Sequence, residues 1–421
     1  MQIIQLITIL LFFLFIQPLQ SQIVNRNDDQ IDFITNTCIG YISPDSIQSY
    51  MQALEDFETR FTLADNRREV AEWIKNKLMS FDYDYMHNDV QVRLDSFELE
   101  MEWPWGSGNI TTTWQYNVEL TLKGHTYPER VYILGAHHDA INWDNPMVNA
   151  PGADDNGSGV AAVLEIARVL AKFHYIPEST IRFVTFSAEE LGLIGAYHYA
   201  KNAHESETNI VMMLNSDMIS NCPVGEDEWI VQLHTYPNSQ HVTDLAKEIT
   251  TRFTELDFVE TDRYSNATDS YPFFDFGYPA IFFHENIFSP NYHSGQDLVV
   301  NTNKHYAAEI IRIPLGMLIK ENKYGFPVKT MDFNTLNEAS KAFPNPFDKK
   351  ATISFTVEKP AHVHISIFNA EGTMVEVVDQ AFFQTGQHAI TWDSKDNNPG
   401  LYFCRILTNT SEQFITLIKQ H

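Results

Sequence analysis

Apolar residues recur every three or four positions in several stretches of this chain, a period typical of amphipathic helices. Two such stretches lie between Ser43 and about Phe81, and a third, GVAAVLEIARVLAKF, opens after a glycine-rich loop. The segments HVTDLAKEITTRF and YAAEIIRIPLGMLIKEN have the same period and predict further helices.

Other stretches have the patterns of strands. The segments VQVRLDSFELE and TTTWQYNVELTLKG alternate apolar and polar residues on either side of a WPWGSGN turn, which predicts a hairpin. Continuous apolar runs in VYILGAHHD, IRFVTFSAE, NIVMMLNSDM and YPAIFFHE are typical of buried strands. Strands that alternate with helices of this length predict an α/β fold, with a mostly parallel sheet covered on both faces.

The pattern changes after Tyr324, so we expect a second domain. Residues 326–340 lack a clear period and are interpreted as a linker between a catalytic domain at 22–325 and a smaller domain at 341–421. From Phe343 on, short alternating strands separated by turn residues replace the helices, which predicts a small all-β sandwich.

Several motifs of this tail resemble a known family. The segments AFPNPF, IFNAEG, TGQHAITWDS and NPGLYFCRI are similar to the C-terminal sorting domain of the type IX (Por) secretion system of Bacteroidetes. The resemblance implies recognition by that secretion machinery and export across the outer membrane, often with removal of the tail. The alternative is a generic β-sandwich adhesion module, which would make the chain an adhesin.

Composition agrees with an exported protein. The chain has 421 residues, and its 28 basic and 55 acidic residues give a formal charge of −27, which argues against binding nucleic acid or an anionic membrane. Residues 1–21 predict a signal peptide, because the apolar core from Ile7 to Ile16 is too short to span a bilayer. No later stretch approaches the length of a membrane span, so we expect a secreted protein without stable membrane insertion.

Three cysteines are too few for a disulfide framework, although a bridge between Cys38 and Cys222 is left open.

Five residues capable of binding metal each follow an apolar run. Successive gaps of 18, 35, 27 and 76 residues are about one strand–helix unit or a multiple of it, so these side chains can meet at one edge of the sheet. Two imidazoles and three carboxylates suit two borderline divalent ions, zinc first, with one carboxylate shared between them. The pattern therefore predicts a metal-dependent hydrolase. The five candidates are His137, Asp155, Glu190, Asp217 and His293.

Neighbouring residues have predicted supporting roles. Asp139 can accept the second N–H of the His137 imidazole and so fix its tautomer. His138 would point to the opposite side of the strand end, where we interpret it as structural. Glycines at 152, 157 and 159 allow the loop that carries Asp155 to pass close to the metals.

Taken together, these motifs resemble the di-zinc aminopeptidases of the bacterial leucyl-aminopeptidase type. PGADDNGSGVAAVLEIARVL, FSAEELGLIGAYHYA, LNSDM and YHSGQD carry the resemblance, which extends from about Ile47 to Asn322. It implies a three-layer α/β/α sandwich around a mixed sheet. It also implies that Asp155 bridges two zinc ions, one completed by His137 and Asp217 and the other by Glu190 and His293, with Asp154 outside the ligand set.

The same resemblance implies the remaining catalytic roles. Glu189 would be the general base that takes a proton from the attacking water and returns it to the leaving amine. Tyr292 would donate a hydrogen bond to the developing oxyanion. The aromatic residues of SYPFFDFGYP either line an apolar pocket for the first substrate side chain or are packing residues; they are Phe273, Phe274, Phe276 and Tyr278.

The expected substrates are peptide or protein N-termini, with preference for an apolar first residue. One alternative is a glutaminyl-peptide cyclotransferase of the same fold, which would use one zinc. The cyclases have a T-D-S sequence in the corresponding loop, whereas this chain has ADDNGSG, which favours the peptidase. A second alternative is a catalytically dead extracellular scaffold, which the presence of all five candidate ligands and Glu189 disfavours.

Overall fold

The structure of the protein is a computed structural model. It describes residues 28–83, 89–173, 175–263, 265–322, 341–357, 359–369, 374–394, 397–408 and 412–420. The predicted signal peptide at 1–21 and the predicted linker at 326–340 lie outside the described residues.

An eight-stranded mixed sheet forms the centre of the larger domain, in the order β1-β2-β4-β3-β5-β8-β6-β7. The four strands β4, β3, β5 and β8 pair in parallel, whereas β1–β2, β2–β4 and β6–β8 are antiparallel. The strands are β1 (Val90–Glu102), β2 (Ile110–Leu122), β3 (Tyr127–His137), β4 (Ser179–Phe186), β5 (Asn209–Ser216), β6 (Ile230–His234), β7 (Asp257–Thr261) and β8 (Ala280–Glu285).

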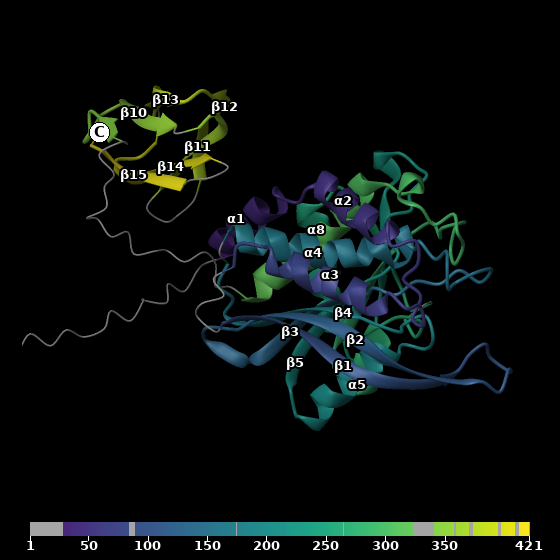
Figure 1. Ribbon diagram of the computed structural model, residues 1–421. Coiled ribbons are helices and arrows are strands. Elements are labelled where there is room, and N and C mark those ends of the chain that lie inside the picture. Colours follow the sequence, from purple (N-terminus) through teal and green to yellow (C-terminus); the bar gives the residue numbers. More distant parts are fainter. Residues whose placement is uncertain are drawn as a thin grey trace, which may run out of the picture.

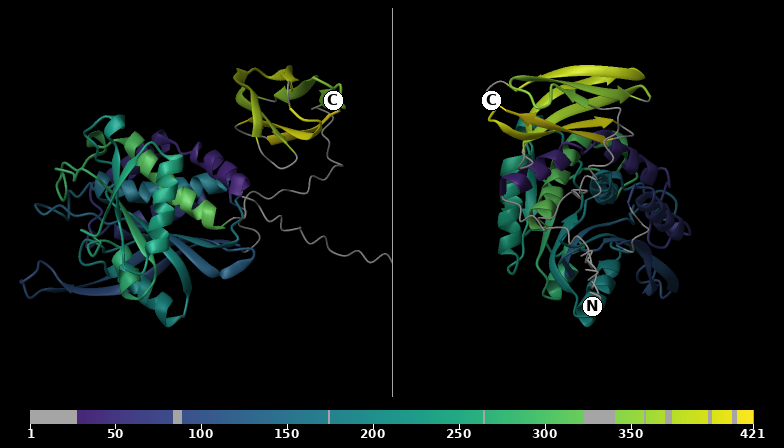
Figure 2. Two further views of the ribbon diagram at one scale, coloured as in Figure 1. Left: turned by 180° about the vertical axis from the view of Figure 1, so that it is seen from behind. Right: turned by 90° about the vertical axis from the view of Figure 1, so that its left-hand side faces the viewer.

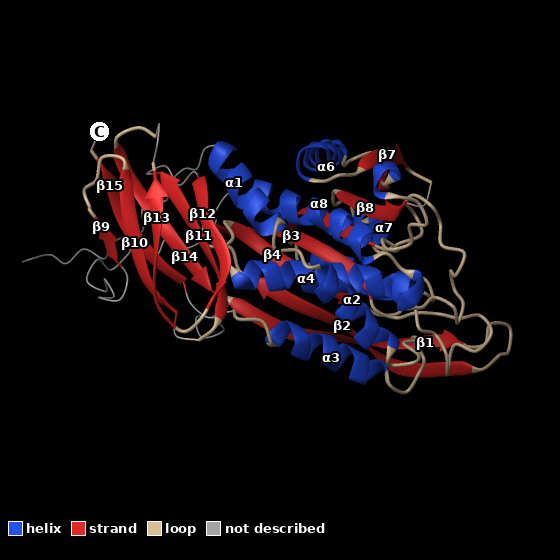
Figure 3. Ribbon diagram, turned by 90° about the horizontal axis from the view of Figure 1, so that it is seen from above, coloured by secondary structure: helices blue, strands red, loops and turns tan. Residues whose placement is uncertain are grey.

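Helices cover both faces of this sheet, as the apolar strands require. Figure 1 shows α1, α2, α3, α4 and α8 on one face and α5 on the other, and Figure 2 shows the same layers from two further sides. Helix α6 lies beside α8 (Figure 3) and shares its apolar core, while α7 packs with α5 on the second face. The helices are α1 (Asp28–Ile39), α2 (Pro44–Glu55), α3 (Arg67–Met79), α4 (Gly159–Lys172), α5 (Ile194–Glu205), α6 (Gln240–Phe253), α7 (Ser270–Asp275) and α8 (Lys304–Asn322).

The predicted three-layer α/β architecture is confirmed. Strand β3 is fully buried from Val131 to its end, and α4 is buried along nearly its whole length, because both lie in the middle of the sandwich. The predicted hairpin is also present, with β1 and β2 paired from Val90–Leu122 to Glu102–Ile110. Within the described part of the chain, no helix is both long enough and apolar enough to cross a membrane.

The C-terminal residues form two antiparallel sheets, as the alternating pattern predicts. One sheet has the order β13-β10-β9 and the other β12-β11-β14-β15. They enclose a separate apolar core that includes Phe355, Ile365 and Trp392. The strands are β9 (Lys341–Phe343), β10 (Lys350–Val357), β11 (Ala361–Asn369), β12 (Met374–Phe383), β13 (Gly386–Asp393), β14 (Gly400–Thr408) and β15 (Glu412–Lys419).

The bridge between Cys38 and Cys222 that the sequence left open is not formed. Both are free thiols, as is Cys404. Cys38 lies in the last turn of α1 and is completely buried in the core, where it packs as a small apolar residue.

Candidate metal centre

The five predicted ligands lie at the end of β3 and on neighbouring loops at one edge of the sheet. His137 is the last residue of β3, and Asp217 directly follows β5. Glu190 comes from the loop after β4, and Asp155 lies in the turn Ala153–Ser158 that leads into α4. His293 comes from the long loop between β8 and the short helix Val299–Asn301. The carboxyl ends of parallel strands meet at this edge, as the spacing of the motifs predicts.

Asp155 lies between the two imidazoles. Its Oδ1 is 3.3 Å from His137 Nε2, and its Oδ2 is 3.2 Å from His293 Nε2. Asp217 Oδ1 approaches the first imidazole, 3.4 Å from His137 Nε2, while Glu190 Oε2 approaches the second, 2.9 Å from His293 Nε2. The donors therefore form two sets that share one carboxylate.

Both glutamates of the SAEE segment reach this centre. Groups of donor atoms that lie within 4.8 Å of one another join His137 with Asp155 and Glu190, and also His137 with Glu189 and Asp217. Glu189 Oε2 is 3.8 Å from His137 Nε2, so the predicted base lies next to the predicted ligands. Burial raises the pKa of Glu189 well above its usual value, against the lowering effect of His137.

Asp139 organises the loop that presents the two glutamates. Its carboxylate accepts hydrogen bonds from the backbone N–H of Glu189 (3.0 Å) and of Glu190 (3.3 Å), and from Thr62 Oγ1 at 2.6 Å. The nearest acceptor for His137 Nδ1 is the backbone carbonyl of Asp139 at 3.0 Å, whereas the carboxylate oxygen is 3.6 Å away. The Asp139 carboxylate is thus closer to the backbone of the glutamate loop than to the His137 imidazole.

His138 lies outside the donor sets, in the structural position expected for it. Its Nδ1 is 3.1 Å from Thr185 Oγ1, and the ring is buried. Burial lowers the pKa of His138 to about 4, so the side chain stays neutral.

The turn that carries Asp155 is held from both sides. Asp297 accepts the backbone N–H of Asp154 and of Asp155, both at 2.9 Å, through its two carboxylate oxygens. Gly152 has φ +53°, and a Cβ there would lie 2.4 Å from the Ala140 side chain. A Cβ on Gly159 would lie 2.1 Å from the carbonyl oxygen of Ser216. Glycine is therefore required where this loop passes β5.

Arg60 is a buried anchor that sequence reasoning missed. Its guanidinium donates to the carbonyls of His138 (2.9 Å), Pro151 and Gly152 (2.7 Å), and more weakly to Leu54 at 3.3 Å. Its acceptors are main-chain oxygens, so the partners carry no side-chain signature in the sequence. Arg60 ties the end of β3 to the segment that precedes Asp155.

The centre has a large excess of buried acid. The carboxyl groups of Asp139, Asp154, Asp155, Asp217, Asp269, Glu285 and Asp297 are all buried around it. Among the described residues, Asp217 Oδ1 and both oxygens of Asp269 are buried without a hydrogen-bond partner. Burying so many carboxylates is costly unless cations accompany them. The donor set, two imidazoles with carboxylates, and these orphaned oxygens fit divalent zinc.

The pKa shifts follow the same geometry. Burial alone would lower the pKa of His293, but hydrogen bonds to the carboxylates of Asp155 and Glu190 outweigh it and raise the pKa to about 10. Burial and the adjacent Asp155 raise the pKa of Glu190 to about 7. The protonated imidazole of His293 and the carboxylates of Asp155 and Glu190 thus stabilise one another. A bound cation would take the place of the imidazole proton.

Asp217 has a hydroxyl partner that the sequence did not reveal. Thr268 Oγ1 donates to Asp217 Oδ2 at 2.8 Å, and Asn215 Nδ2 donates to the same hydroxyl at 2.5 Å. Thr268 immediately precedes the buried Asp269. The only sequence signal here is one acid within a polar loop, SNATDS, which is common on protein surfaces.

Tyr292 lies against the second imidazole. Its ring stacks on that of His293, with centroids 3.6 Å apart and planes inclined by 21°. The residue is 42% exposed, and its partial burial together with nearby carboxylates raises the pKa of its phenol. The phenol therefore stays protonated and able to donate a hydrogen bond.

The aromatic segment SYPFFDFGYP is mainly packing. Phe273 is fully buried on the second face of the sheet, where its ring lies 6.0 Å from that of Phe186. Phe274, Phe276 and Tyr278 pack against the same cluster and are partly buried. Of the two interpretations of this segment, the core position of Phe273 supports packing.

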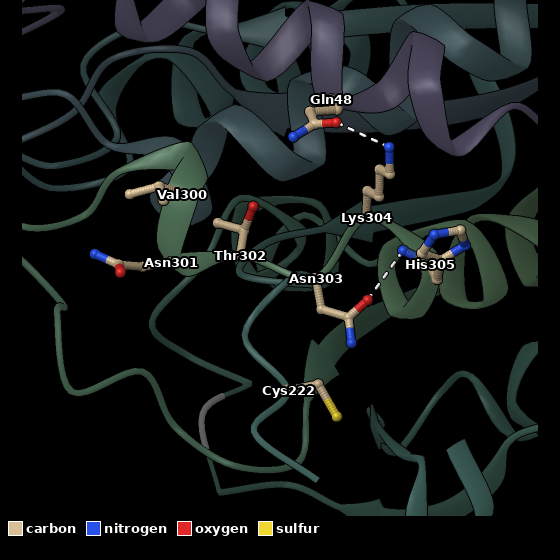
Figure 4. Close-up of a pocket in the computed structure, with 8 residues that line it drawn as sticks. All are labelled: Gln48, Cys222, Val300, Asn301, Thr302, Asn303, Lys304 and His305. Carbon is tan, nitrogen blue, oxygen red and sulfur yellow. Dashed lines mark hydrogen bonds between the residues drawn. The ribbon is translucent and has the colours of Figure 1, made fainter. Parts of the chain in front are cut away.

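A separate surface pocket of about 410 Å³ lies where α8 begins. Figure 4 shows its lining, in which Lys304 Nζ donates to Gln48 Oε1 at 2.9 Å and the backbone N–H of His305 donates to Asn303 Oδ1 at 3.0 Å. The other residues drawn are Cys222, Val300, Asn301 and Thr302. None of these eight residues belongs to the metal centre, so we assign the chemistry to the strand-end cluster instead.

Comparison with known proteins agrees with this geometry. The description of peptidase family M28 matches residues 117–317, and that of a secretion system C-terminal sorting domain matches residues 341–420. A probable zinc metalloprotease of Pyrenophora tritici-repentis is 30% identical over 289 residues, which are 58% of this chain and 64% of that protein. Leucine aminopeptidase 1 of Ajellomyces dermatitidis is 26% identical over 288 residues, 66% of this chain and 70% of the relative.

Solved structures share the fold of the larger domain. The LapA aminopeptidase of Legionella pneumophila has a TM-score of 0.56 at 18% identity and covers 68% of this chain and 74% of its own. A glutaminyl cyclase of Bacteroides thetaiotaomicron, solved with N-acetylhistamine, has a TM-score of 0.52 at 17% identity, over 66% of this chain and 98% of its own. One fold thus carries both of the activities weighed from the sequence.

Proposed function

We propose that the protein is an exported zinc aminopeptidase, because residues 117–317 match peptidase family M28 and residues 341–420 match a secretion system C-terminal sorting domain. It would remove N-terminal residues, preferentially apolar ones, from peptides outside the cell. The type IX secretion machinery would be its partner in export.

The position of Asp155 is the observation that carries this proposal. Its two oxygens face two different imidazoles at 3.3 and 3.2 Å, and each imidazole has a further carboxylate beside it. His137 and Asp217 would hold one zinc, His293 and Glu190 the other, and Asp155 both. Two zinc ions would supply Lewis acidity for the attacking water and the substrate carbonyl.

Glu189 is the residue we assign to proton transfer. It belongs to the loop that Asp139 fixes through two backbone N–H groups, so its carboxylate is held at a set position. Beside two zinc ions its carboxylate would be ionised, so it could accept a proton from the attacking water and then deliver it to the leaving amine. Asp139 is a positioning residue for this step.

Tyr292 is assigned to the substrate carbonyl. Its protonated hydroxyl, on a ring stacked against His293, can donate to the oxygen that becomes negative as water attacks. Loss of one such donor typically costs about 10²-fold or more in kcat.

A panel of aminoacyl p-nitroanilides tests the proposal. The purified protein should hydrolyse the leucine derivative, lose the activity in a chelator and regain it when zinc is added. The N-acetylated leucine derivative is the matched control, and an exopeptidase that requires a free amine should leave it intact. Equal cleavage of both, or activity indifferent to the chelator, would contradict the proposal. Cyclisation of a glutaminyl peptide without release of a free amino acid would favour the cyclotransferase instead.

A further inference from the structure

Aromatic rings form a continuous line from the tip of the β1–β2 hairpin to the metal centre. The ring of Trp103 lies 5.0 Å from Phe61 and 5.0 Å from Trp105. Trp105 lies 6.0 Å from Trp143, which in turn lies 5.3 Å from the imidazole of His293. The inner end of this line therefore contacts a proposed zinc ligand.

The outer rings of this line face solvent. Trp105 and Trp143 are each 55% exposed, and the loop of Trp143 also exposes Met147 and Val148. Single exposed apolar residues are ordinary on protein surfaces, whereas contiguous large ones mark binding sites. We call the pair Trp105 and Trp143 the tryptophan rim. Figure 3 shows that the β1–β2 hairpin, whose tip carries Trp105, extends past the helices at the end of the sheet where the loops gather.

The rim is built on an ordered loop. Asn142 Nδ2 donates to the carbonyl of Asn149 at 2.8 Å, which closes the loop on itself. The backbone N–H of Trp143 approaches the carbonyl of His293 at 3.4 Å. The backbone N–H of Ala150 donates to the backbone carbonyl of Glu58 at 2.9 Å. A surface ordered before binding loses little conformational entropy when a ligand covers it.

The spacing of the two indoles matches an extended peptide. A strand rises about 3.3 Å per residue, and its alternate side chains point to the same face. Two residues of extended chain therefore span roughly 6.6 Å, close to the 6.0 Å between the rings of Trp105 and Trp143. Alternate side chains of one strand could each cover one indole.

We propose that the tryptophan rim binds the part of a peptide substrate that follows the scissile bond, with Trp143 contacting the first residue after that bond and Trp105 the third. This inference rests on the proposed aminopeptidase activity. In such an enzyme the free amine lies at the metals, so the rest of the peptide must leave toward solvent. The rim is an exposed apolar surface that continues from His293 on the side of the β1–β2 hairpin, whereas Tyr292 and Phe288 continue from the same imidazole within its own loop. It favours large apolar side chains at alternate positions.

Two amide-capped peptides and a minimal substrate test this proposal. Leu-Phe-Ala-Phe-amide places aromatic side chains at the first and third positions after the scissile bond, and Leu-Ala-Phe-Ala-amide places one at the second. Leucinamide has no residue beyond the bond and provides the reference. The measurement is kcat/KM for each peptide divided by kcat/KM for leucinamide, in the zinc-loaded full chain.

In the wild type, the ratio for Leu-Phe-Ala-Phe-amide should exceed the ratio for Leu-Ala-Phe-Ala-amide. The first ratio should fall about tenfold in Trp105→Ala and in Trp143→Ala, since each variant loses one aromatic contact. Trp143→Phe should restore most of it. Trp114→Ala is the matched control, because Trp114 is 52% exposed on the same hairpin and pairs with Glu98, away from the turn. Damage to His293 alone would slow leucinamide equally and leave the ratio unchanged.

The contrary results are distinct. A ratio unchanged in Trp105→Ala, or lowered as much in Trp114→Ala, would overturn the rim proposal while leaving the aminopeptidase intact. A dimer that dissociates in Trp105→Ala with an unchanged ratio would assign the rim to a second copy and also overturn it. No hydrolysis of leucinamide or either peptide by the wild type would overturn the proposed function itself.

Discussion

Replacing Arg60 with methionine should destabilise the larger domain strongly, although Arg60 touches no proposed ligand. Methionine keeps much of the length of the side chain but removes every donor. The carbonyls of His138 and Pro151 would then lose their buried partner, whereas the carbonyl of Gly152 would keep the backbone N–H of Gly157 at 2.9 Å.

The size of the effect follows from those acceptors. A buried polar group left without a partner costs about 1–3 kcal/mol, so the two carbonyls cost roughly 2–6 kcal/mol. Relief of the buried charge offsets part of this, because burial lowers the pKa of Arg60 to about 10 despite the nearby Asp297 and Asp139. A net loss of about 3 kcal/mol corresponds to a midpoint lowered by roughly 6–12 °C in a domain of this size.

Thermal unfolding of the metal-free full chain, followed by circular dichroism, measures this shift without a contribution from bound zinc. Arg68→Met is the matched control, since Arg68 lies on the surface of α3 and its side chain is 67% exposed. That variant should change stability by less than about 0.5 kcal/mol. If Arg60→Met unfolds at the same temperature as Arg68→Met, the guanidinium does not hold the Asp155 segment, and the reasoning is refuted.

Three further predictions concern the centre and the tail. Glu189→Gln should retain both zinc ions and lower kcat by roughly 10²- to 10⁴-fold, whereas Glu190→Gln should lose zinc; the reverse pattern in metal analysis would exchange their roles. Asp155→Ala should bind at most one zinc and Asp154→Ala should bind nearly two, so equal losses would show that the wrong acid of the pair was chosen as the bridge. A chain ending at Asn337 should keep the full kcat of the purified enzyme, because the tail has its own apolar core; a large loss would mean that the tail supports the active site.

The sequence predicted the elements whose burial is large and regular. Strand β3 and helix α4 carry long apolar patterns because they lie at the centre of the sandwich. Helix α5 went unpredicted, since its buried face consists largely of small residues such as Ala196 and Ala200 and shows no strong apolar period. Strands β6 and β7 also went unpredicted, because they are short and form the last two strands at one end of the sheet, where pairing depends on distant residues.

The residues of the candidate centre likewise include some that the sequence predicted and some that it did not. His137 and Asp217 were predictable because each follows a buried strand, and strand ends of a parallel sheet converge. Arg60 was not, because it acts on main-chain carbonyls. Asp269 was not, because a single acid in a polar loop has no distinguishing pattern. Which glutamate of the SAEE pair is the base came only from resemblance, and the structure brings both within reach of the imidazoles.

The β1–β2 hairpin has a consequence for how this enzyme could change. Strand β4 pairs with β2 only from Val118 to Leu122, so the distal half of the hairpin is a two-stranded ribbon outside the main sheet. Such a ribbon needs outside contacts, which Gln115 supplies through a 2.9 Å hydrogen bond to the carbonyl of Thr62. The turn beyond Trp103, at 104–109, can therefore vary in length and residue type while the strand ends that carry the proposed ligands stay in place. With Trp105 of the proposed tryptophan rim at this turn, changes there would alter which peptides bind and leave the proposed metal ligands untouched.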